Sequence, residues 1–355
     1  MNEKFNDQTR ELLTSHFRTY PNLQVQDVFK FLFQSAFGCE HLVSDEEKVL
    51  SYIKTEYSAL DEASAPRTDA LDGDYSRAHL SWMNAGLSPA TLAKLFCLSA
   101  KKEPDGLASL EEKLGAARDL IEEKVIPLDL DDFDRKLYEW RSAGFPAVHH
   151  SDVFREKYRP AYRVVSNKYA SILPLLAKID ILTQKGRTVI AIEGGSASGK
   201  STLADVLTDV YDCAVIHMDD FFLRPEQRTE ARLSEVGGNL DRERFLHEVI
   251  RPTSESKPVV YRPFDCSTQT LGEPVTLPQK NLTIVEGVYS MHPAFGNYYD
   301  LALFLDISPD KQRERIKVRN TPWLAERFFS EWIPMENVYF EKMGIKGRCD
   351  LVIPV

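Results

Sequence analysis

The sequence predicts two folds in one chain: a separate, mostly α-helical domain over residues 1–182, and an α/β domain with a doubly wound, parallel, five-stranded sheet over residues 187–355. Three observations lead to this prediction. Apolar residues in the first half recur at helical spacing, whereas after Leu182 short apolar runs alternate with helical stretches. The first of those runs leads into a glycine-rich segment that ends in Gly-Lys-Ser, the spacing of a P-loop.

Helical signals recur through the first half. Apolar residues spaced three or four apart predict a helix around Val25 to Ala36, and Ser88 followed by Pro89 predicts the start of another that continues over Ala90 to Lys101. A third helix is expected from Leu107 to Lys124. The stretch from Leu60 to Asp74 is rich in Ala, Ser, Asp, Pro and Gly and has no periodicity, so it is expected to be a loop.

Five short apolar runs form the predicted sheet. A change of pattern at residues 183–187 marks the expected domain boundary, and each run after it is suited to a parallel strand buried on both faces. The runs are Thr188–Glu193, Ala214–Met218, Leu282–Glu286, Leu301–Ile307 and Asp350–Val355. Because such sheets bind ligands beyond the carboxyl ends of their strands, the residues that follow the runs are candidate site residues.

The segment after the first run is the strongest motif of the chain. Its candidate nucleotide-binding residues are Gly194, Gly195, Ser196, Ala197, Ser198, Gly199, Lys200, Ser201 and Thr202. Glycines let the backbone turn its amides toward phosphate oxygens, and the helix that follows adds its positive end. Lys200 is expected to contact the β- and γ-phosphates of ATP, and Ser201 to bind Mg²⁺. A Gly/Ser linker is the alternative, but linkers lack the flanking strand and helix.

Carboxylates follow two further strands. Asp219 and Asp220 come at the end of the second run, and Glu286 closes the third, as in a Walker-B-like element. Transfer of a phosphoryl group to a hydroxyl needs a proton acceptor and ligands for Mg²⁺, so Asp219 is the candidate base. Asp219 and Glu286 are also candidate Mg²⁺ ligands with Ser201, and Asp220 is a candidate substrate contact. A turn-forming Asp pair is the alternative reading of Asp219 and Asp220.

From about Arg187 to Val355 the chain resembles the uridine kinase, phosphoribulokinase and nicotinamide riboside kinase group of P-loop kinases. The segments that carry the resemblance are Gly194–Thr202, Asp219–Phe222, Gly238–Asp241 before Phe245, Pro263–Asp265, Val285–Gly287, and the pair Arg315 and Arg319. The resemblance implies a kinase that uses ATP and Mg²⁺ to phosphorylate a hydroxyl on a small nucleoside- or sugar-like acceptor.

The resemblance also implies roles for individual residues. Asp219 matches the catalytic aspartate, and Asp241 the aspartate that holds the acceptor's sugar hydroxyls. Arg315 and Arg319 match lid arginines that neutralise the transferred phosphate, although on pattern alone they could be a solvated helix face. Phe264 and Asp265 are implied substrate contacts, and a turn is an equal alternative for Asp265.

Two departures from the group leave the acceptor open. The chain has Phe264-Asp265-Cys266 and then Gln269 where uridine kinases have Tyr-Asp-Phe and a histidine that contacts the pyrimidine, and residues 319–323 differ from the expected lid. The alternatives are a related kinase for nicotinamide riboside, pantothenate or another polyol, and, from a different class, a nucleotide-dependent switch or binding module. The switch would act through the helical domain.

Composition indicates which classes of partner and which cell compartment to expect. The chain has 355 residues and five scattered cysteines. Its formal charge of −10 argues against nucleic acid as a partner and favours a small molecule. No apolar run is long enough to span a bilayer and the N-terminus is polar, so we expect a cytoplasmic protein with no membrane partner. The sequence leaves open whether the protein is a homo-oligomer. The helical domain is expected to regulate the kinase domain, to dimerise, or to complete the acceptor site.

One segment of the helical domain is unusual. Between residues 146 and 163, three aromatic and three arginine residues each repeat every four positions: Phe154, Tyr158 and Tyr162, and Arg155, Arg159 and Arg163. The arginines could bind an anionic ligand or the nucleotide domain, but core aromatics with surface ion pairs are the alternative. His41, His79, His149 and His150 offer metal ligands, yet their spacing gives no support for a site.

Overall fold

The structure is a computed structural model that describes residues 2–39, 45–60, 64–101 and 103–355. The chain divides into two compact units, Met1–Ile181 and Leu182–Val355, and each contains its own sheet. Within the described ranges, no helix is both long enough and apolar enough to cross a membrane.

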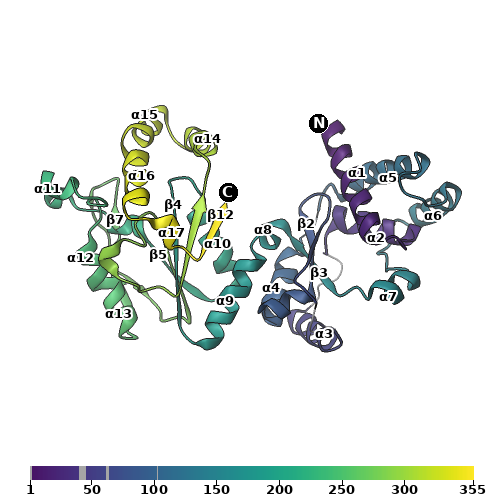
Figure 1. Ribbon diagram of the computed structural model, residues 1–355, viewed down its shortest axis with the longest axis horizontal. Coiled ribbons are helices and arrows are strands. Elements are labelled where there is room, and N and C mark those ends of the chain that lie inside the picture. The colour runs from purple at the N-terminus through teal and green to yellow at the C-terminus, as the bar shows by residue number, and fades with distance from the viewer. Residues whose placement is uncertain (1, 40–44, 61–63, 102) are drawn as a thin grey trace. The chain divides into compact units, whose positions relative to one another are not determined.

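The first unit is mostly helical (Figure 1). In chain order its elements are α1 (Asn2–Thr19), α2 (Val25–Phe37), α3 (Glu46–Ser58), β1 (Thr68–Ala70), β2 (Tyr75–His79), η2 (Leu80–Ala85), α4 (Pro89–Ser99), α5 (Gly106–Glu122), α6 (Leu130–Ser142), α7 (Asp152–Tyr158), β3 (Tyr162–Ser166), α8 (Asn167–Ala170) and α9 (Leu173–Lys185), the last of which continues into the second unit. The three helices expected from the sequence are α2, α4 and α5. Ser88 caps α4 as predicted, since its hydroxyl accepts from the Thr91 amide.

A three-stranded antiparallel sheet in this unit was not predicted. Its order is β1-β2-β3, with Ser76 beside Val165 in the pairing of β2 and β3. The predicted loop from Leu60 to Asp74 is therefore wrong where it contains β1, and residues 61–63 of it lie outside the described ones. This strand was not predictable, because β1 has three residues, which are too few to show the alternation of a strand.

The predicted aromatic and arginine stripes are also wrong. Helix α7 ends at Tyr158, because Arg159 takes a left-handed backbone with φ 42° and Pro160 follows it. Tyr162 then lies on β3, where side chains alternate between the two faces. Phe154 and Tyr158 stay together on α7 and pack with Tyr20 and Leu23, as the core alternative had it.

The second unit alternates strands and helices around one main sheet. Its elements after α9 are β4 (Thr188–Gly194), α10 (Lys200–Val210), β5 (Cys213–His217), η3 (Met218–Phe221), η4 (Pro225–Gln227), α11 (Glu230–Leu233), α12 (Arg242–Phe245), η5 (Leu246–Ile250), α13 (Arg251–Ser254), β6 (Val259–Tyr261), β7 (Phe264–Asp265), β8 (Thr270–Leu271), β9 (Val275–Leu277), β10 (Leu282–Glu286), η6 (Pro293–Phe295), β11 (Leu301–Asp306), α14 (Pro309–Arg319), α15 (Pro322–Arg327), η7 (Phe328–Trp332), α16 (Ile333–Lys342), α17 (Ile345–Arg348) and β12 (Leu351–Pro354).

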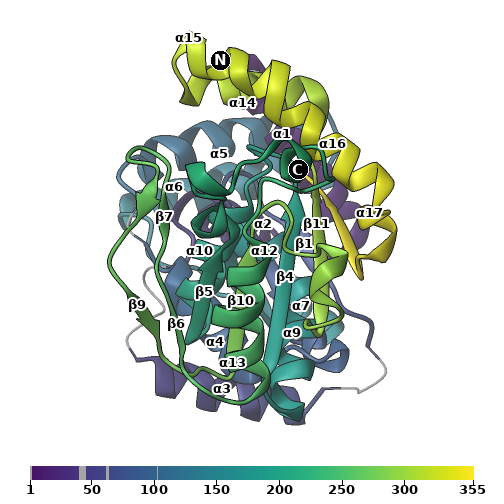
Figure 2. The same cartoon turned by 90° about the vertical axis from the view of Figure 1, so that its left-hand side faces the viewer.

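The main sheet confirms the predicted fold class. Five parallel strands lie in the order β12-β11-β4-β10-β5, and Figure 2 shows β11, β4, β10 and β5 side by side. Every residue of β4 is buried, because helices cover both faces of the sheet. Two short antiparallel pairs, β6 with β9 and β7 with β8, are inserted between β5 and β10 and were not predicted.

Strand register places the candidate site. Glu286 at the end of β10 lies beside Ile192 of β4 on one side and His217 of β5 on the other. Gly194, which ends β4, lies beside Leu305 of β11. The carboxyl ends of β4, β5 and β10 therefore meet at one edge of the sheet, as expected for a doubly wound fold.

Candidate active site

The loop between β4 and α10 has the backbone that a P-loop needs. Gly194 has φ 144°, and a Cβ there would come within 2.7 Å of the Leu305 carbonyl oxygen. Gly199, with φ 99°, is the residue from which α10 begins. Only glycine takes these conformations without strain. The loop thus turns sharply out of the sheet and into the positive end of an eleven-residue helix.

Lys200 closes this loop from within. The lysine is 9% exposed, and its Nζ donates to the carbonyl oxygens of Gly194 at 2.8 Å and Gly195 at 3.0 Å. Two neutral carbonyls hold the ammonium without cancelling its charge. The positive charge therefore lies at the loop, where it can act on phosphate oxygens.

Ser201 and Glu286 lie together beside the loop. The Ser201 hydroxyl donates to Oε1 of Glu286 at 3.0 Å, and His217 Nδ1 donates to the same oxygen at 2.6 Å. Burial alone would raise the pKa of Glu286, but the hydrogen bonds and the charges of His217 and Lys200 lower it. The hydrogen bond to Glu286 raises the pKa of His217 in turn. His217 escaped sequence reasoning, although its place at a strand end next to Asp219 was a usable signal.

Asp219 is open at the same edge. Its side chain reaches solvent, and its carboxylate makes no hydrogen bond with the residues that the structure describes. Surrounding protein atoms still exclude part of the water around it, which raises its pKa, and Glu286 and Asp220 add to the rise while Lys200 opposes it. Asp220 differs, because its Oδ2 accepts from the Tyr261 hydroxyl at 2.9 Å. Asp219 is thus the carboxylate available to an incoming hydroxyl.

The family resemblance implied that Asp241 holds the acceptor's sugar hydroxyls, and in the structure this residue has protein partners. Asp241 is 1% exposed and caps α12, with Oδ1 accepting from the Arg244 amide at 3.1 Å. Its Oδ2 accepts from the Gln227 side chain at 2.8 Å. Both oxygens are therefore engaged by protein donors, and an acceptor's hydroxyls have no access to them in this arrangement.

Phe264 and Asp265 also have local partners. Phe264 is 5% exposed and lies in the β7–β8 pair. Asp265 is exposed, and its Oδ1 accepts from the amide and the hydroxyl of Ser267 at 2.7 and 2.6 Å. That geometry is the turn that the alternative reading predicted for Asp265. Neither residue has a contact here that marks it as a substrate ligand.

The two arginines of α14 are placed differently. Arg315 Nη1 donates to the Ala197 carbonyl at 3.0 Å and to the Ser198 carbonyl at 3.4 Å, so this side chain lies on the P-loop. Arg319 is exposed in the last turn of the helix, and no described residue bonds to it. Only Arg315 is therefore built into the site in this arrangement.

Sequence reasoning missed a carboxylate that binds the P-loop. Glu336 of α16 is 6% exposed, and its carboxylate accepts from the Ser196 amide at 2.8 Å and from the Ser196 hydroxyl. Gln312 of α14 donates to the carbonyl of the same residue at 2.8 Å. Burial raises the pKa of Glu336, although the bonds from Ser196 and the charge of Lys200 lower it. One loop amide is thus occupied by a carboxylate of the chain itself.

A second missed carboxylate, Glu193, lies directly before the loop. It is fully buried, and its Oε1 accepts from the Met291 amide at 3.0 Å and the Tyr339 hydroxyl at 2.7 Å. Burial raises its pKa to about 7, even though those bonds and the charge of Lys200 act in the other direction. A short apolar strand that ends in a glutamate gave no sign that the side chain is enclosed.

We expect Glu193 to make the second unit less stable as pH rises. In the unfolded chain its pKa returns to about 4.5, so between about pH 4.5 and pH 7 the folded state holds a proton that the unfolded state has lost. Glu193→Gln removes this group, so the stability advantage of wild type over the variant should fall by about 3 kcal/mol from pH 4 to pH 8. Urea unfolding of both proteins at several pH values checks this. A stability difference independent of pH would contradict it.

The residues present fit a magnesium ion better than a transition metal. Ser201 and Glu286 offer oxygen ligands, and Mg²⁺ is commonly held by one or two protein oxygens together with substrate phosphates. Across the described ranges, no three His, Cys, Asp or Glu side chains gather as a metal site. His79, His149 and His150 belong to no such group among the described residues, and His41 lies outside them.

No protein-family model matches this chain, and no curated protein matches it. Solved structures that resemble part of it include a possible uridine kinase from Bacillus stearothermophilus, with 23% identity and a TM-score of 0.38 over 50% of this chain and 98% of that one. Another is a candidate fructose transport system kinase from Silicibacter sp. TM1040, with 22% identity and a TM-score of 0.37 over 48% and 90%. At these values the likenesses assign no activity to this chain.

Proposed function

We propose that the second unit is a kinase that transfers the γ-phosphoryl group of ATP to a hydroxyl on a small nucleoside- or sugar-like acceptor. The observation that carries the proposal is the convergence of three groups at one sheet edge. These groups are the P-loop with Lys200, the adjoining oxygens of Ser201 and Glu286, and the open carboxylate of Asp219. Phosphoryl transfer to an alcohol requires these three kinds of group.

Each group has a role in the proposed reaction. The acceptor oxygen bonds to the γ-phosphorus while the bond to the β,γ-bridging oxygen breaks, so ADP leaves and the hydroxyl proton passes to Asp219. Lys200 and the loop amides stabilise the negative charge that moves onto the bridging oxygen. Ser201 and Glu286 would hold Mg²⁺, which neutralises phosphate charge when bound. Arg315 adds a further cation beside the loop.

The test is ADP release with Mg²⁺ over a panel of nucleosides, ribosides and small polyols, including nicotinamide riboside and pantothenate, with mass detection of the product. A phosphorylated product from one acceptor supports the kinase and names its substrate. Turnover that depends on a protein partner, with no acceptor phosphorylated, would replace the proposal with a nucleotide-dependent switch.

Glu336→Gln should bind ATP about five- to tenfold more tightly than wild type, because a carboxylate on the Ser196 amide repels an arriving polyphosphate. Glutamine keeps the shape and an acceptor oxygen but removes the charge. Calorimetric titration with Mg²⁺ and a non-hydrolysable ATP analogue measures the change.

Glu331→Gln is the matched control. Glu331 is exposed on η7 and pairs with Arg327 at 2.8 Å, so its loss of charge should leave ATP affinity unchanged. Weaker binding by Glu336→Gln would show instead that the carboxylate holds the loop in its binding shape.

A further inference from the structure

The first unit buries a positive charge that no described carboxylate neutralises. Arg77 of the central strand β2 is 1% exposed. Its Nε donates to Gln34 Oε1 at 2.9 Å, and its Nη1 lies 3.2 Å from His16 Nε2. Nη2 has no hydrogen-bond partner among the described residues. Buried guanidinium groups are always charged and are normally paired, so an unused Nη2 indicates a missing partner.

Two carboxylates of this unit, Asp27 and Asp69, have other partners. Asp27 is fully buried and accepts four hydrogen bonds, from the amides of Gln24 and Ser151, the Ser151 hydroxyl and His150 Nδ1. Asp69 accepts from Tyr20, Arg67 and His79. No ion pair joins Arg77 to a described Asp or Glu. The described part of this unit therefore supplies no anion for the Arg77 guanidinium.

A second cation, Lys30, lies on α2 one helical turn before Gln34, the residue that accepts from Arg77. Lys30 of α2 is partly buried, and its Nζ donates to the Val148 carbonyl at 2.9 Å. Burial and repulsion from Arg77 and Arg155 lower its pKa to about 8, while Asp27 opposes them only weakly. An anion between these groups would remove the repulsion and favour the charged lysine.

Two residues of the cluster are partly exposed, although Arg77 itself is buried. Tyr162 lies over the Arg77 guanidinium at 4.7 Å, and both Tyr162 and Lys30 keep part of their surface exposed. Burial lowers the pKa of His16, and Arg77 lowers it further, which favours the neutral ring. An incoming group would meet the cations Arg77 and Lys30, with Arg155 as a further positive charge near Lys30.

We propose that Arg77 and Lys30 form a binding site for an oxyanion, the phosphate or carboxylate group of a small molecule, within the first unit. Guanidinium and ammonium groups both donate to such oxygens, and an oxyanion supplies the acceptor that Nη2 lacks. The site uses none of the P-loop residues, so it stands whether or not the kinase proposal holds.

The experiment follows ¹⁵N-labelled histidine side chains of the full chain by NMR while inorganic phosphate or acetate is added at constant ionic strength and pH 7. His16 and His150 report on the proposed site, and His217 reports on the P-loop, with signals assigned by single His→Gln variants. Saturable shifts of the His16 and His150 signals are expected with at least one of the anions. Shifts with phosphate but not with acetate identify a phosphate site. Shifts with acetate identify a carboxylate site.

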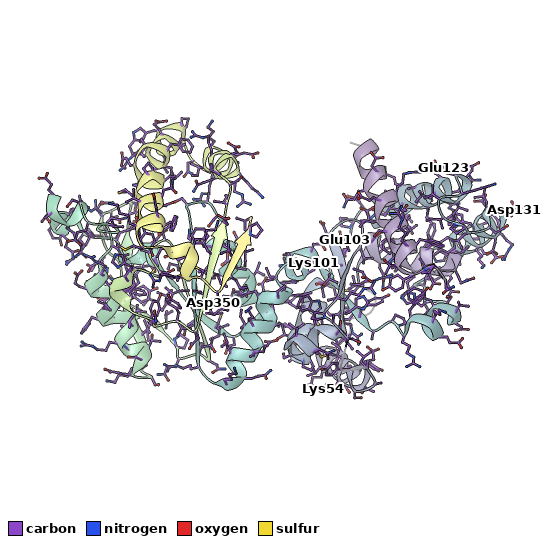
Figure 3. All side chains as sticks on the ribbon, viewed as in Figure 1. Lys54, Lys101, Glu103, Glu123, Asp131 and Asp350 are labelled. Carbon is purple, nitrogen blue, oxygen red and sulfur yellow. The ribbon has the colours of Figure 1, made fainter. Side chains whose placement is uncertain are left out.

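Three variants make the result specific. Lys30→Met should weaken the binding about tenfold, because one charged hydrogen bond is lost. Arg77→Met should abolish it if that variant folds, and Lys30→Met carries the test if it does not. Lys54→Met, on the exposed surface of α3 and labelled in Figure 3, removes the same charge and should change nothing. Shifts confined to His217, or binding equal in Lys30→Met and wild type, would overturn the proposal.

Discussion

Lys200→Ala is expected to lower the rate of phosphoryl transfer at least about a hundredfold, the usual effect of removing one charge-stabilising donor from an active site. The reason is geometric. The ammonium is held over the P-loop by the carbonyls of Gly194 and Gly195, at 2.8 and 3.0 Å, and no other described lysine donates to that loop. Alanine leaves the loop's amides in place but removes this ammonium. Steady-state ADP release with the acceptor found in the panel measures the loss.

The control for this variant is Lys257→Ala. Lys257 is exposed and pairs with Glu255 at 2.7 Å, so its removal takes away the same charge from the second unit without touching the loop. Its rate should equal that of wild type. If Lys200→Ala kept wild-type transfer with the fold intact, the P-loop would not be the catalytic phosphate site, and the kinase proposal would fail with it.

Asp219→Asn is expected to lower transfer about 10²- to 10⁴-fold while leaving ATP binding close to that of wild type, the range usual for a general base. Asn keeps the shape of the side chain but cannot take the hydroxyl proton. The expectation depends on the Asp219 carboxylate being open at the sheet edge and bonded to no described residue, whereas Asp220 is engaged by Tyr261. Single-turnover transfer and calorimetric ATP binding separate the two effects.

Asp212→Asn is the matched control, because Asp212 is exposed and pairs only at the surface with Lys280 at 2.6 Å. It should transfer at the wild-type rate. If Asp219→Asn lost ATP binding and transfer in the same proportion, Asp219 would be a ligand of the nucleotide and its metal rather than the base. Undiminished transfer would remove Asp219 from the chemistry altogether.

Local sequence patterns were sufficient wherever a feature is built by consecutive residues. The five strands of the main sheet, the loop from Gly194 to Gly199 and the cap at Ser88 each depend on neighbours in the chain, and the structure has them where they were expected. The same reasoning failed for β1 and for the stripes on α7. A three-residue strand is too short to show a period, and the predicted helix stops at Arg159.

The same distinction holds for the candidate site, where residues at strand ends were predicted and residues brought in by long-range contacts were not. Strand ends predicted that Lys200, Ser201, Asp219 and Glu286 would share one sheet edge, since parallel strands put their carboxyl ends together. The carboxylates that adjoin the loop were not predictable. Glu336 contacts Ser196 across 140 residues of sequence, and Glu193 meets Tyr339 across 146. Asp241, which the family resemblance implied for the acceptor, caps α12 in the structure.

By itself, the sequence determined the fold of the second unit and the chemistry of its loop, because strands, turns and helix starts are fixed by residues close together in the chain. Only the tertiary structure decided which charges are enclosed, open or without a partner. Glu193, Glu336 and Arg77 are ordinary residues in the sequence. Their properties come from burial and from contacts with distant segments, which alter the solvation of a charge in ways that no local pattern records.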